Sequence, residues 1–238
     1  MEKLIEEIKT VAKELVKLGW APANAGNFSI LLDMPPAGYS NNFGIPLNLD
    51  GSYPNLGGNY ILTKISGSTM EELWESPEQY SCVVRIDKEN TATMWQLKPS
   101  AYMNIKLTSE YKIHLGILNL SLKENKSYRA VLHTHPDNLS SVLYYLTHRE
   151  KERFLELLYK QQPAVAAFLA QEVGIIPYVP PGSIELANKI LKEVERNHSL
   201  VIMEQHGCVA TNRTLLKALE VIKLVFCEPL FYRQLKSI

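Results

Sequence analysis

The chain has 238 residues, of which 46% are hydrophobic and 21% charged, a composition typical of globular proteins. Its 25 basic residues balance its 25 acidic ones, which argues against a protein built mainly to bind nucleic acid or an anionic membrane. The three cysteines are widely spaced, which indicates a protein without disulfides. The first residues are charged and no apolar run reaches about 18 residues, so we expect neither a signal peptide nor a membrane span. A cytoplasmic protein is therefore expected.

The first part of the chain predicts a helix, a strand and a long irregular stretch. Apolar residues at helical spacing predict a helix over 4–16, which Gly19 ends, and the apolar run 28–32 predicts a strand. From 33 to 59, proline, glycine and asparagine are so frequent that we expect a long irregular loop within the domain. A lid, an oligomer contact and a flexible excursion are all compatible with this composition.

The remaining strands and helices predict a single α/β domain over residues 1–238, in which helices cover a central sheet. Strands are expected at 60–65, 81–86, 91–97, 130–135, 175–179 and 200–210, the last as one buried apolar run. Helices are expected at 109–122, at 139–170 with a break near Pro163, after the cap Ser183, and from 214 to about 235 with a bend or break at Pro229.

The sharpest local signal is His133-Thr134-His135-Pro136, at the end of an apolar run. Side chains alternate along a strand, so His133 and His135 should project together and Thr134 should point to the opposite face. Two neutral imidazoles side by side are good ligands for zinc and similar metals. Two partly buried histidines with ordinary hydrogen bonds are the alternative.

A protein-held metal needs a third ligand, and two of the other histidines are candidates. His206 ends an apolar run and precedes Gly207, which suits a close backbone approach at a cleft. His114 is the weaker competitor, four residues after Glu110 on the same helix face. His148 lies in a charged run and His198 in a predicted surface turn, so neither is expected at the site.

Three polar stretches could bind or activate an anionic substrate. Thr108 or Ser109 can cap the helix that follows, and Glu110 is either a dipole-stabilising residue of its first turn or a general base beside a metal. The stretches 24–29 and 66–69 contain small residues whose backbone N–H groups could form anion-binding cups, although such stretches are also ordinary turns.

Taken in order, these segments resemble the class II aldolase/adducin family. The matching stretches lie between about residues 5 and 228 and comprise Gly19, Gly26-Asn27-Phe28-Ser29, Ile61-Leu62-Thr63, Ser66-Gly67, Thr108-Ser109-Glu110, His133-Thr134-His135-Pro136 and His206-Gly207. The resemblance implies a three-layer α/β/α fold with a central, mainly antiparallel sheet.

The resemblance also implies roles for the singled-out residues. His133, His135 and His206 would hold one catalytic zinc ion per subunit, or another divalent metal, and Glu110 would be the general acid/base. A sugar-phosphate substrate would contact Asn24, Gly26, Asn27, Ser66, Gly67, Thr108 and Ser109. Members of the family are commonly homotetramers with the site near a subunit boundary.

The implied reaction is the reversible retro-aldol cleavage of a ketose 1-phosphate to dihydroxyacetone phosphate and a short aldehyde. The stretch 173–183 is most similar to members that cleave L-rhamnulose 1-phosphate, with L-lactaldehyde as the second product. Cleavage of L-fuculose 1-phosphate and 4-epimerisation of L-ribulose 5-phosphate are alternatives within the family. A metal-free, adducin-like assembly module is the alternative outside enzymes.

Two local departures from the family pattern concern the substrate. The phosphate loop reads Thr63-Lys64-Ile65-Ser66-Gly67, one residue longer than the usual Thr-Gly-Ser-Gly, and Lys64 either adds a charge or points away. The stretch 162–171 also lacks the additional acidic residue found in similar aldolases before the segment that begins at Val173.

Overall fold

A computed structural model describes residues 1–36, 44–88, 90–99, 105–137, 139, 148–169 and 172–227. Within these residues, nine strands form one sheet in the order β2-β5-β4-β3-β1-β6-β9-β8-β7. Only β7 and β8 pair in parallel, and all other neighbours are antiparallel. The strands are β1 (Asn27–Leu32), β2 (Ile45–Asn48), β3 (Tyr60–Lys64), β4 (Ser81–Lys88), β5 (Thr91–Gln96), β6 (Ala130–Thr134), β7 (Val173–Ile176), β8 (Leu200–Met203) and β9 (Gly207–Asn212).

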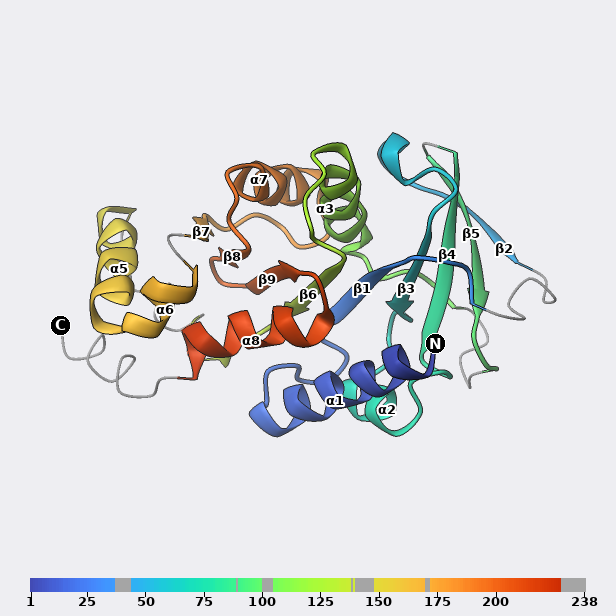
Figure 1. Cartoon of the computed structure of the whole chain (residues 1–238), viewed down its shortest axis with the longest axis horizontal. Coiled ribbons are helices and arrows are strands. Elements are labelled where there is room, and N and C mark those ends of the chain that lie inside the picture. The colour runs from blue at the N-terminus through green and yellow to red at the C-terminus, as the bar shows by residue number, and fades with distance from the viewer. Residues whose placement is uncertain are drawn as a thin grey trace.

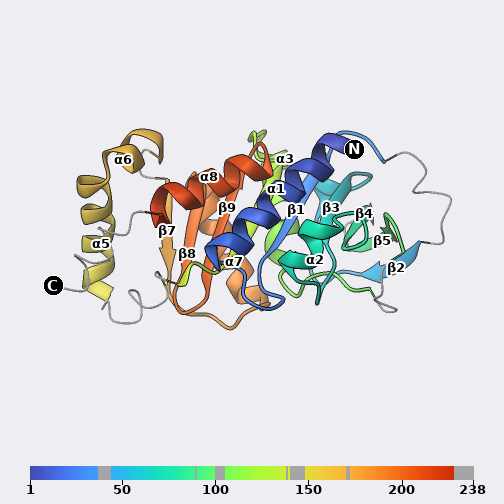
Figure 2. The same ribbon diagram turned by 90° about the horizontal axis from the view of Figure 1, so that it is seen from below.

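Helices cover both faces of the sheet (Figures 1 and 2). One face carries α1 (Glu2–Leu18), α2 (Met70–Glu75) and α8 (Leu215–Phe226), and the other carries α3 (Tyr111–Lys123) and α7 (Ile184–Glu195). Beyond β7, at one end of the molecule, lie α5 (His148–Gln161) and α6 (Pro163–Leu169). The expected α/β class with a mainly antiparallel, helix-covered sheet is therefore confirmed.

Alternating side chains of the strands divide the core into two apolar layers. Leu132 of β6 packs in the layer beneath α1 and α8, whereas its neighbour Val131 packs in the layer beneath α3 and α7. α1 contributes Ile8 and Leu15 to the first layer, and it ends at Gly19, which adopts φ 69°. Both faces of the central strands are thus buried, which makes the sheet a rigid support for residues at its strand ends.

The apolar run 200–210, expected as one strand, forms two, so that prediction is wrong. β8 ends at Met203 and β9 begins at Gly207, and the two strands pair antiparallel across a tight turn. The turn is made by Glu204, Gln205 and His206, with Gln205 in the left-handed region at φ 55°. Three polar residues inside an apolar run were the sequence signal for this reversal.

Part of the stretch from 33 to 59 is regular. It contains the edge strand β2 and the 3₁₀ helix η2 (Pro54–Leu56), while residues 37–43 lie outside the described part of the chain. The short helix α2 was not predicted, although Thr69 and Glu72 form a capping box at its start. Most of 138–147 and the predicted break at Pro229 also lie outside the described residues.

The remaining predicted elements are present with shifted ends. β3, β4 and β5 form the expected neighbouring strands, and the break near Pro163 separates α5 from α6. Ser183 accepts a hydrogen bond at the start of α7, and Thr214 accepts one at the start of α8.

Nowhere in the described ranges is there a helix with the length and apolar character needed to cross a bilayer.

Candidate metal centre and pocket

The two histidines at the end of β6 face the same space. His133 lies within the strand and His135 directly follows it, and their Nε2 atoms are 2.8 Å apart. Thr134, between them, points the other way, and its Oγ1 donates to the carbonyl of Trp20 at 2.6 Å. The predicted alternation is therefore present, although the strand ends one residue earlier than expected.

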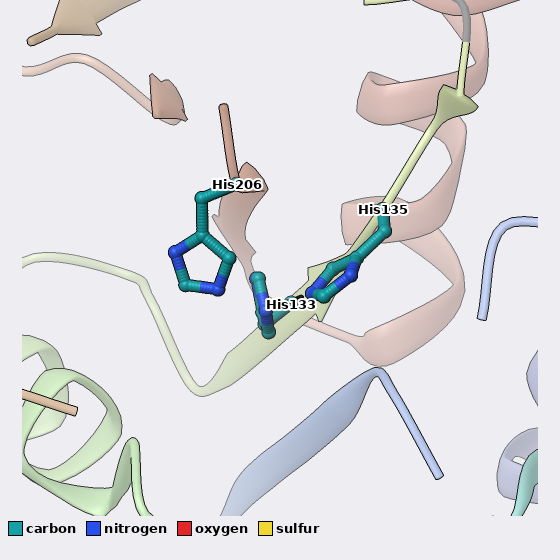
Figure 3. Close-up of side chains that lie close together, drawn as sticks. All are labelled: His133, His135 and His206. Carbon is teal, nitrogen blue, oxygen red and sulfur yellow. Dashed lines mark hydrogen bonds between the residues drawn. The ribbon is translucent and has the colours of Figure 1, made fainter. Parts of the chain in front are cut away.

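His206 joins this pair from the turn between β8 and β9 (Figure 3). Its ring centroid lies 4.9 Å from that of His133 and 5.2 Å from that of His135. The adjacent Gly207 permits this approach, because a Cβ there would lie 2.4 Å from the backbone oxygen of Thr134. A side chain at this position would push β9 away from β6 and carry His206 with it.

The three imidazoles form a donor set that suits a divalent cation. Each offers a ring nitrogen within 4.8 Å of the other two. His133 Nδ1 donates to the carbonyl of Cys208 at 2.9 Å, which leaves the lone pair on the Nε2 that faces His135. Burial lowers the pKa of His133, and burial together with the neighbouring rings lowers the pKa of His135 to about 3. Both rings are therefore neutral at pH 7, as metal binding requires.

The carboxylate of Glu110 lies directly against this cluster. Its Oε2 is 3.0 Å from His133 Nε2, and its Oε1 is 3.2 Å from His206 Nε2. Burial raises the pKa of Glu110, but the hydrogen bonds that its carboxylate accepts from His206 and from the amide of Asn27, which donates to Oε2 at 3.2 Å, oppose burial, and the pKa is lowered overall. The result is an ionised carboxylate beside the histidine cluster.

Glu110 reaches the cluster because it precedes the helix instead of lying in its first turn. α3 begins at Tyr111, two residues later than expected, and Glu110 is its N-cap residue, with no side-chain bond to the helix. Thr108 Oγ1 instead accepts a hydrogen bond from the backbone N–H of Glu110 at 3.3 Å. The interpretation of Glu110 as a first-turn residue is therefore corrected, and its side chain is free to point into the sheet end.

A pocket of about 260 Å³ opens beside these groups. The structure brings all the predicted site residues to its wall: Asn24, Gly26, Asn27, Ser66, Gly67, Thr108, Ser109, Glu110, His133, His135 and His206. They come from the turn before β1 and the start of that strand, the turn after β3, the start of α3, the end of β6 and the turn between β8 and β9. Four further residues line the pocket, namely Ala25, Lys64, Ile65 and Pro181, which were not among the predicted contact residues although the sequence had singled out the stretches that contain them.

Pro181 belongs to a corner that is held in place against the start of α3. Gly182 adopts φ +71°, and a Cβ there would come within 3.3 Å of the backbone oxygen of Ser109. Lys112 Nζ donates to the carbonyl of Gly182 at 3.2 Å and lies 3.3 Å from the carboxylate of Asp50. The Pro-Pro-Gly sequence signalled a sharp corner, but only the fold shows that the corner forms one wall of the pocket.

The other described histidines lie outside the metal-ligand set. His114 is 1% exposed on α3, and its two ring nitrogens have no hydrogen-bond partner among the described residues. His198 is partly buried and pairs through Nδ1 with Glu193 at 2.7 Å. Of the two candidates for a third ligand, the structure therefore places His206, and not His114, beside His133 and His135.

The sequence of this chain is similar to a known family over almost its whole length. The family model described as the Class II Aldolase and Adducin N-terminal domain matches residues 6–226. A rhamnulose-1-phosphate aldolase from Bacteroides thetaiotaomicron is 28% identical, in an alignment that covers 100% of this chain and 87% of that protein. A rhamnulose-1-phosphate aldolase from Listeria monocytogenes serotype 4b is 26% identical, with 89% of this chain and 77% of that protein covered.

Solved structures show the same architecture. A sugar-phosphate aldolase from Thermotoga maritima superposes with a TM-score of 0.82 and 26% identity, covering 100% of this chain and 95% of that one. The L-fuculose-1-phosphate aldolase from Thermus thermophilus superposes with a TM-score of 0.59 and 17% identity, covering 100% and 97% of the two chains. The second comparison concerns the fold alone.

Proposed function

The chain belongs to the class II aldolase and adducin family, and from this premise we propose that it is a metal-dependent aldolase acting on a ketose 1-phosphate. The proposal rests above all on one observation, the convergence of three imidazoles and the Glu110 carboxylate in one pocket. An assembly module of the adducin type would have no use for three clustered imidazoles beside a buried carboxylate. The proposed metal ligands are His133, His135 and His206, and zinc is the proposed metal.

Cleavage of the C3–C4 bond of a ketose 1-phosphate leaves a pair of electrons on the carbon that becomes C3 of dihydroxyacetone phosphate. A divalent cation held by the three histidines supplies positive charge against the negative charge that develops on the neighbouring oxygens. In the overall cleavage the C4 hydroxyl loses a proton as the aldehyde forms, and C3 gains one. No oxidant or further reactant is needed.

We propose that Glu110 exchanges the proton at C3, as acid during cleavage and as base during synthesis. Its position supports this role, because the buried carboxylate lies within 3.2 Å of two proposed metal ligands and lines the pocket. Asn27 fixes its orientation through the hydrogen bond to Oε2. The anion-binding part of the pocket would be formed by Asn24, Gly26, Ser66, Gly67, Thr108 and Ser109, on the remaining wall.

The proposed substrate is L-rhamnulose 1-phosphate, with dihydroxyacetone phosphate and L-lactaldehyde as products. Similarity to the rhamnulose-1-phosphate aldolases of Bacteroides thetaiotaomicron and Listeria monocytogenes supports this choice. A panel of L-rhamnulose 1-phosphate, L-fuculose 1-phosphate and L-ribulose 5-phosphate tests it. If kcat/KM is highest with one of the other two sugars, that sugar replaces the proposed substrate. If an epimerised product forms, epimerisation replaces the proposed reaction.

Glu110→Gln tests the chemistry, because the amide keeps the shape of the side chain but cannot exchange a proton. We expect retro-aldol kcat to fall about 10²- to 10⁴-fold, the usual contribution of a positioned acid/base. Bound metal, measured by elemental analysis, should stay at the wild-type level. Unchanged kcat in Glu110→Gln would remove the proposed role.

His206→Ala tests the metal centre separately. We expect this variant to lose most of its metal and its activity, since two histidines remain where three are needed. His198→Ala is the matched control, because His198 lies outside the ligand set and should leave metal content unchanged. A purified wild-type protein without stoichiometric metal and without turnover would instead favour the assembly module.

A further inference from the structure

His135 lies beyond the hydrogen-bonded ladders that hold its neighbour His133. The pairing of β1 with β6 ends at Asn27–His133, and the pairing of β6 with β9 ends at Thr134–Cys208. The ring of His133 is also fixed by the bond from its Nδ1 to the carbonyl of Cys208. In the described part of the chain, the ring of His135 makes no hydrogen bond other than its contact with His133. The position of the His135 ring therefore depends on how its backbone is held.

A single backbone carbonyl, that of Trp20, holds this end of β6. It accepts the backbone N–H of His135 at 2.8 Å and the side-chain hydroxyl of Thr134 at 2.6 Å. The Thr134 side chain is fully buried, and a hydrogen bond in such a low-dielectric interior is stronger than one in water. Because the two donors belong to consecutive residues, the shared acceptor fixes the path of the chain as it leaves the strand.

Trp20 is itself held firmly at the end of α1. The N–H of Gly19 donates to the carbonyl of Val16 at 3.1 Å. The N–H of Trp20 donates to the carbonyl of Leu15 at 3.1 Å, and together these are the two bonds of a Schellman motif. The indole of Trp20 lies edge to face against Phe226 of α8, with ring centroids 6.2 Å apart. The acceptor for Thr134 and His135 is therefore anchored in the apolar layer beneath α1 and α8.

We propose that Thr134 is a positioning residue for the metal centre, because its hydroxyl holds the backbone from which the His135 ring extends. The inference rests on the proposed metal binding by the three histidines and deepens it. A metal-binding imidazole is usually oriented by a hydrogen bond from its other ring nitrogen, as His133 is by Cys208. For His135 the corresponding constraint lies one residue away in the chain. Without the hydroxyl, one of the two bonds to Trp20 is lost and the ring can move relative to the other two ligands.

Thr134→Val removes the hydroxyl and keeps the shape of the side chain. The affinity of the purified chain for Zn²⁺ is measured by competition with a chromogenic chelator. We expect it to fall about 10- to 100-fold, the usual effect of removing a group that orients a metal ligand. The visible absorption spectrum of the Co²⁺-loaded protein should also change, because it depends on how the ligands are arranged around the metal.

Thr211→Val is the matched control. Thr211 is 1% exposed, and its Oγ1 donates to the carbonyl of Ala130 at 3.1 Å, at the opposite end of β6 from the histidines. This variant therefore loses the same kind of buried bond to a backbone carbonyl. We expect both variants to lose stability in urea denaturation, but only Thr134→Val to change Zn²⁺ affinity and the Co²⁺ spectrum. An equal loss of Zn²⁺ affinity in the two variants would overturn the inference, since the bond would then act only through stability.

A second pair of variants decides the question if Thr134→Val does not fold. Thr134→Ser and Thr134→Ala both lack the γ-methyl group and differ from each other in the hydroxyl. We expect the serine variant to keep Zn²⁺ affinity and the Co²⁺ spectrum close to wild type, and the alanine variant to lose both. Equal Zn²⁺ affinity of the two, or a wild-type chain that binds neither metal, overturns the inference. Weaker Zn²⁺ binding by Thr134→Ala alone, without retro-aldol turnover by the wild type, supports the inference and overturns the proposed aldolase.

Discussion

At the scale of single residues, the pocket combines neutral imidazoles with one negative and one positive side chain. The neutral rings of His133 and His135, an ionised Glu110 and a charged Lys64 line one cavity of about 260 Å³. A low-dielectric wall strengthens each of these interactions compared with water. The pocket is thus equipped to bind a cation at the strand ends and an anion near Lys64, which fits a phosphorylated substrate and a metal-dependent reaction.

Phosphate affinity should depend on pH through Lys64. Its pKa in the folded protein is lowered to about 8 by burial, with Glu72 of α2 opposing the shift, so the ammonium form is lost as pH rises above 8. A phosphate monoester stays dianionic over this range, because its second pKa is about 6. The Kd of methyl phosphate, measured by calorimetry, should therefore rise between pH 7 and pH 9.5. The same titration of Lys64→Met isolates this group, and an equal pH dependence in that variant would show that another group causes it.

At the scale of elements, the histidine cluster depends on how closely β9 approaches β6. The two strands pair from Ala130–Asn212 to Thr134–Cys208, and this register brings the turn that carries His206 beside His135. Gly207 stands at the point of closest approach. The position of His206 relative to His133 and His135 therefore follows from the register of β9 on β6 and from the tight turn that joins β8 to β9.

The substitution Gly207→Ala should disturb the pairing of β9 with β6 and so displace His206. The new Cβ would meet the backbone oxygen of Thr134 at 2.4 Å, and a backbone atom cannot move aside as a flexible side chain can. We expect a loss of about 1–3 kcal/mol in the free energy of unfolding, together with reduced metal content. Urea denaturation and elemental analysis measure both quantities. Gly57→Ala is the control, because a Cβ there meets its nearest neighbour, Pro54, at an ordinary 3.5 Å; equal behaviour of the two variants would disprove the steric argument.

At the scale of the whole molecule, the three histidines proposed to bind metal lie at the end of β6 and in the turn between β8 and β9. β6 lies next to β1, and β9 connects it to β8 and β7. A metal that binds only the folded arrangement stabilises the entire sheet by mass action. That the chain folds as one domain over residues 1–238 and assembles into a homotetramer stays a prediction, which proteolysis and light scattering would test.

Removal of the metal should lower the thermal stability of the wild-type protein. At a metal concentration of about 100 times Kd, binding contributes roughly 2.7 kcal/mol. For a chain of this size, that corresponds to a fall in Tm of about 5–10 °C on chelation. Differential scanning calorimetry with and without a chelator measures this change. His206→Ala should show almost no response, so an equal shift in that variant would place the stabilising metal elsewhere.

The sequence by itself determined what depends on neighbours along the chain. The alternation of side chains along a strand correctly placed His133 and His135 on one face. The cap residue Ser183 and the helix-ending Gly19 could also be predicted, because helix-end signals involve only a few neighbouring residues. The run 200–210 shows the limit of such rules. Its composition favoured a single buried strand, whereas the polar residues from Glu204 to His206 form a reversal.

Only the tertiary structure decided which distant residues meet. Glu110 contacts Asn27 from 83 residues away, and His133 donates to Cys208 from 75 residues away. The selection of His206 over His114, and the placement of Lys64 in the pocket wall, depend on sheet register and on the close approach of strands at Gly207. These features arise from long-range packing on both faces of the sheet. The local periodicity of a sequence does not show which strands pair or in which register.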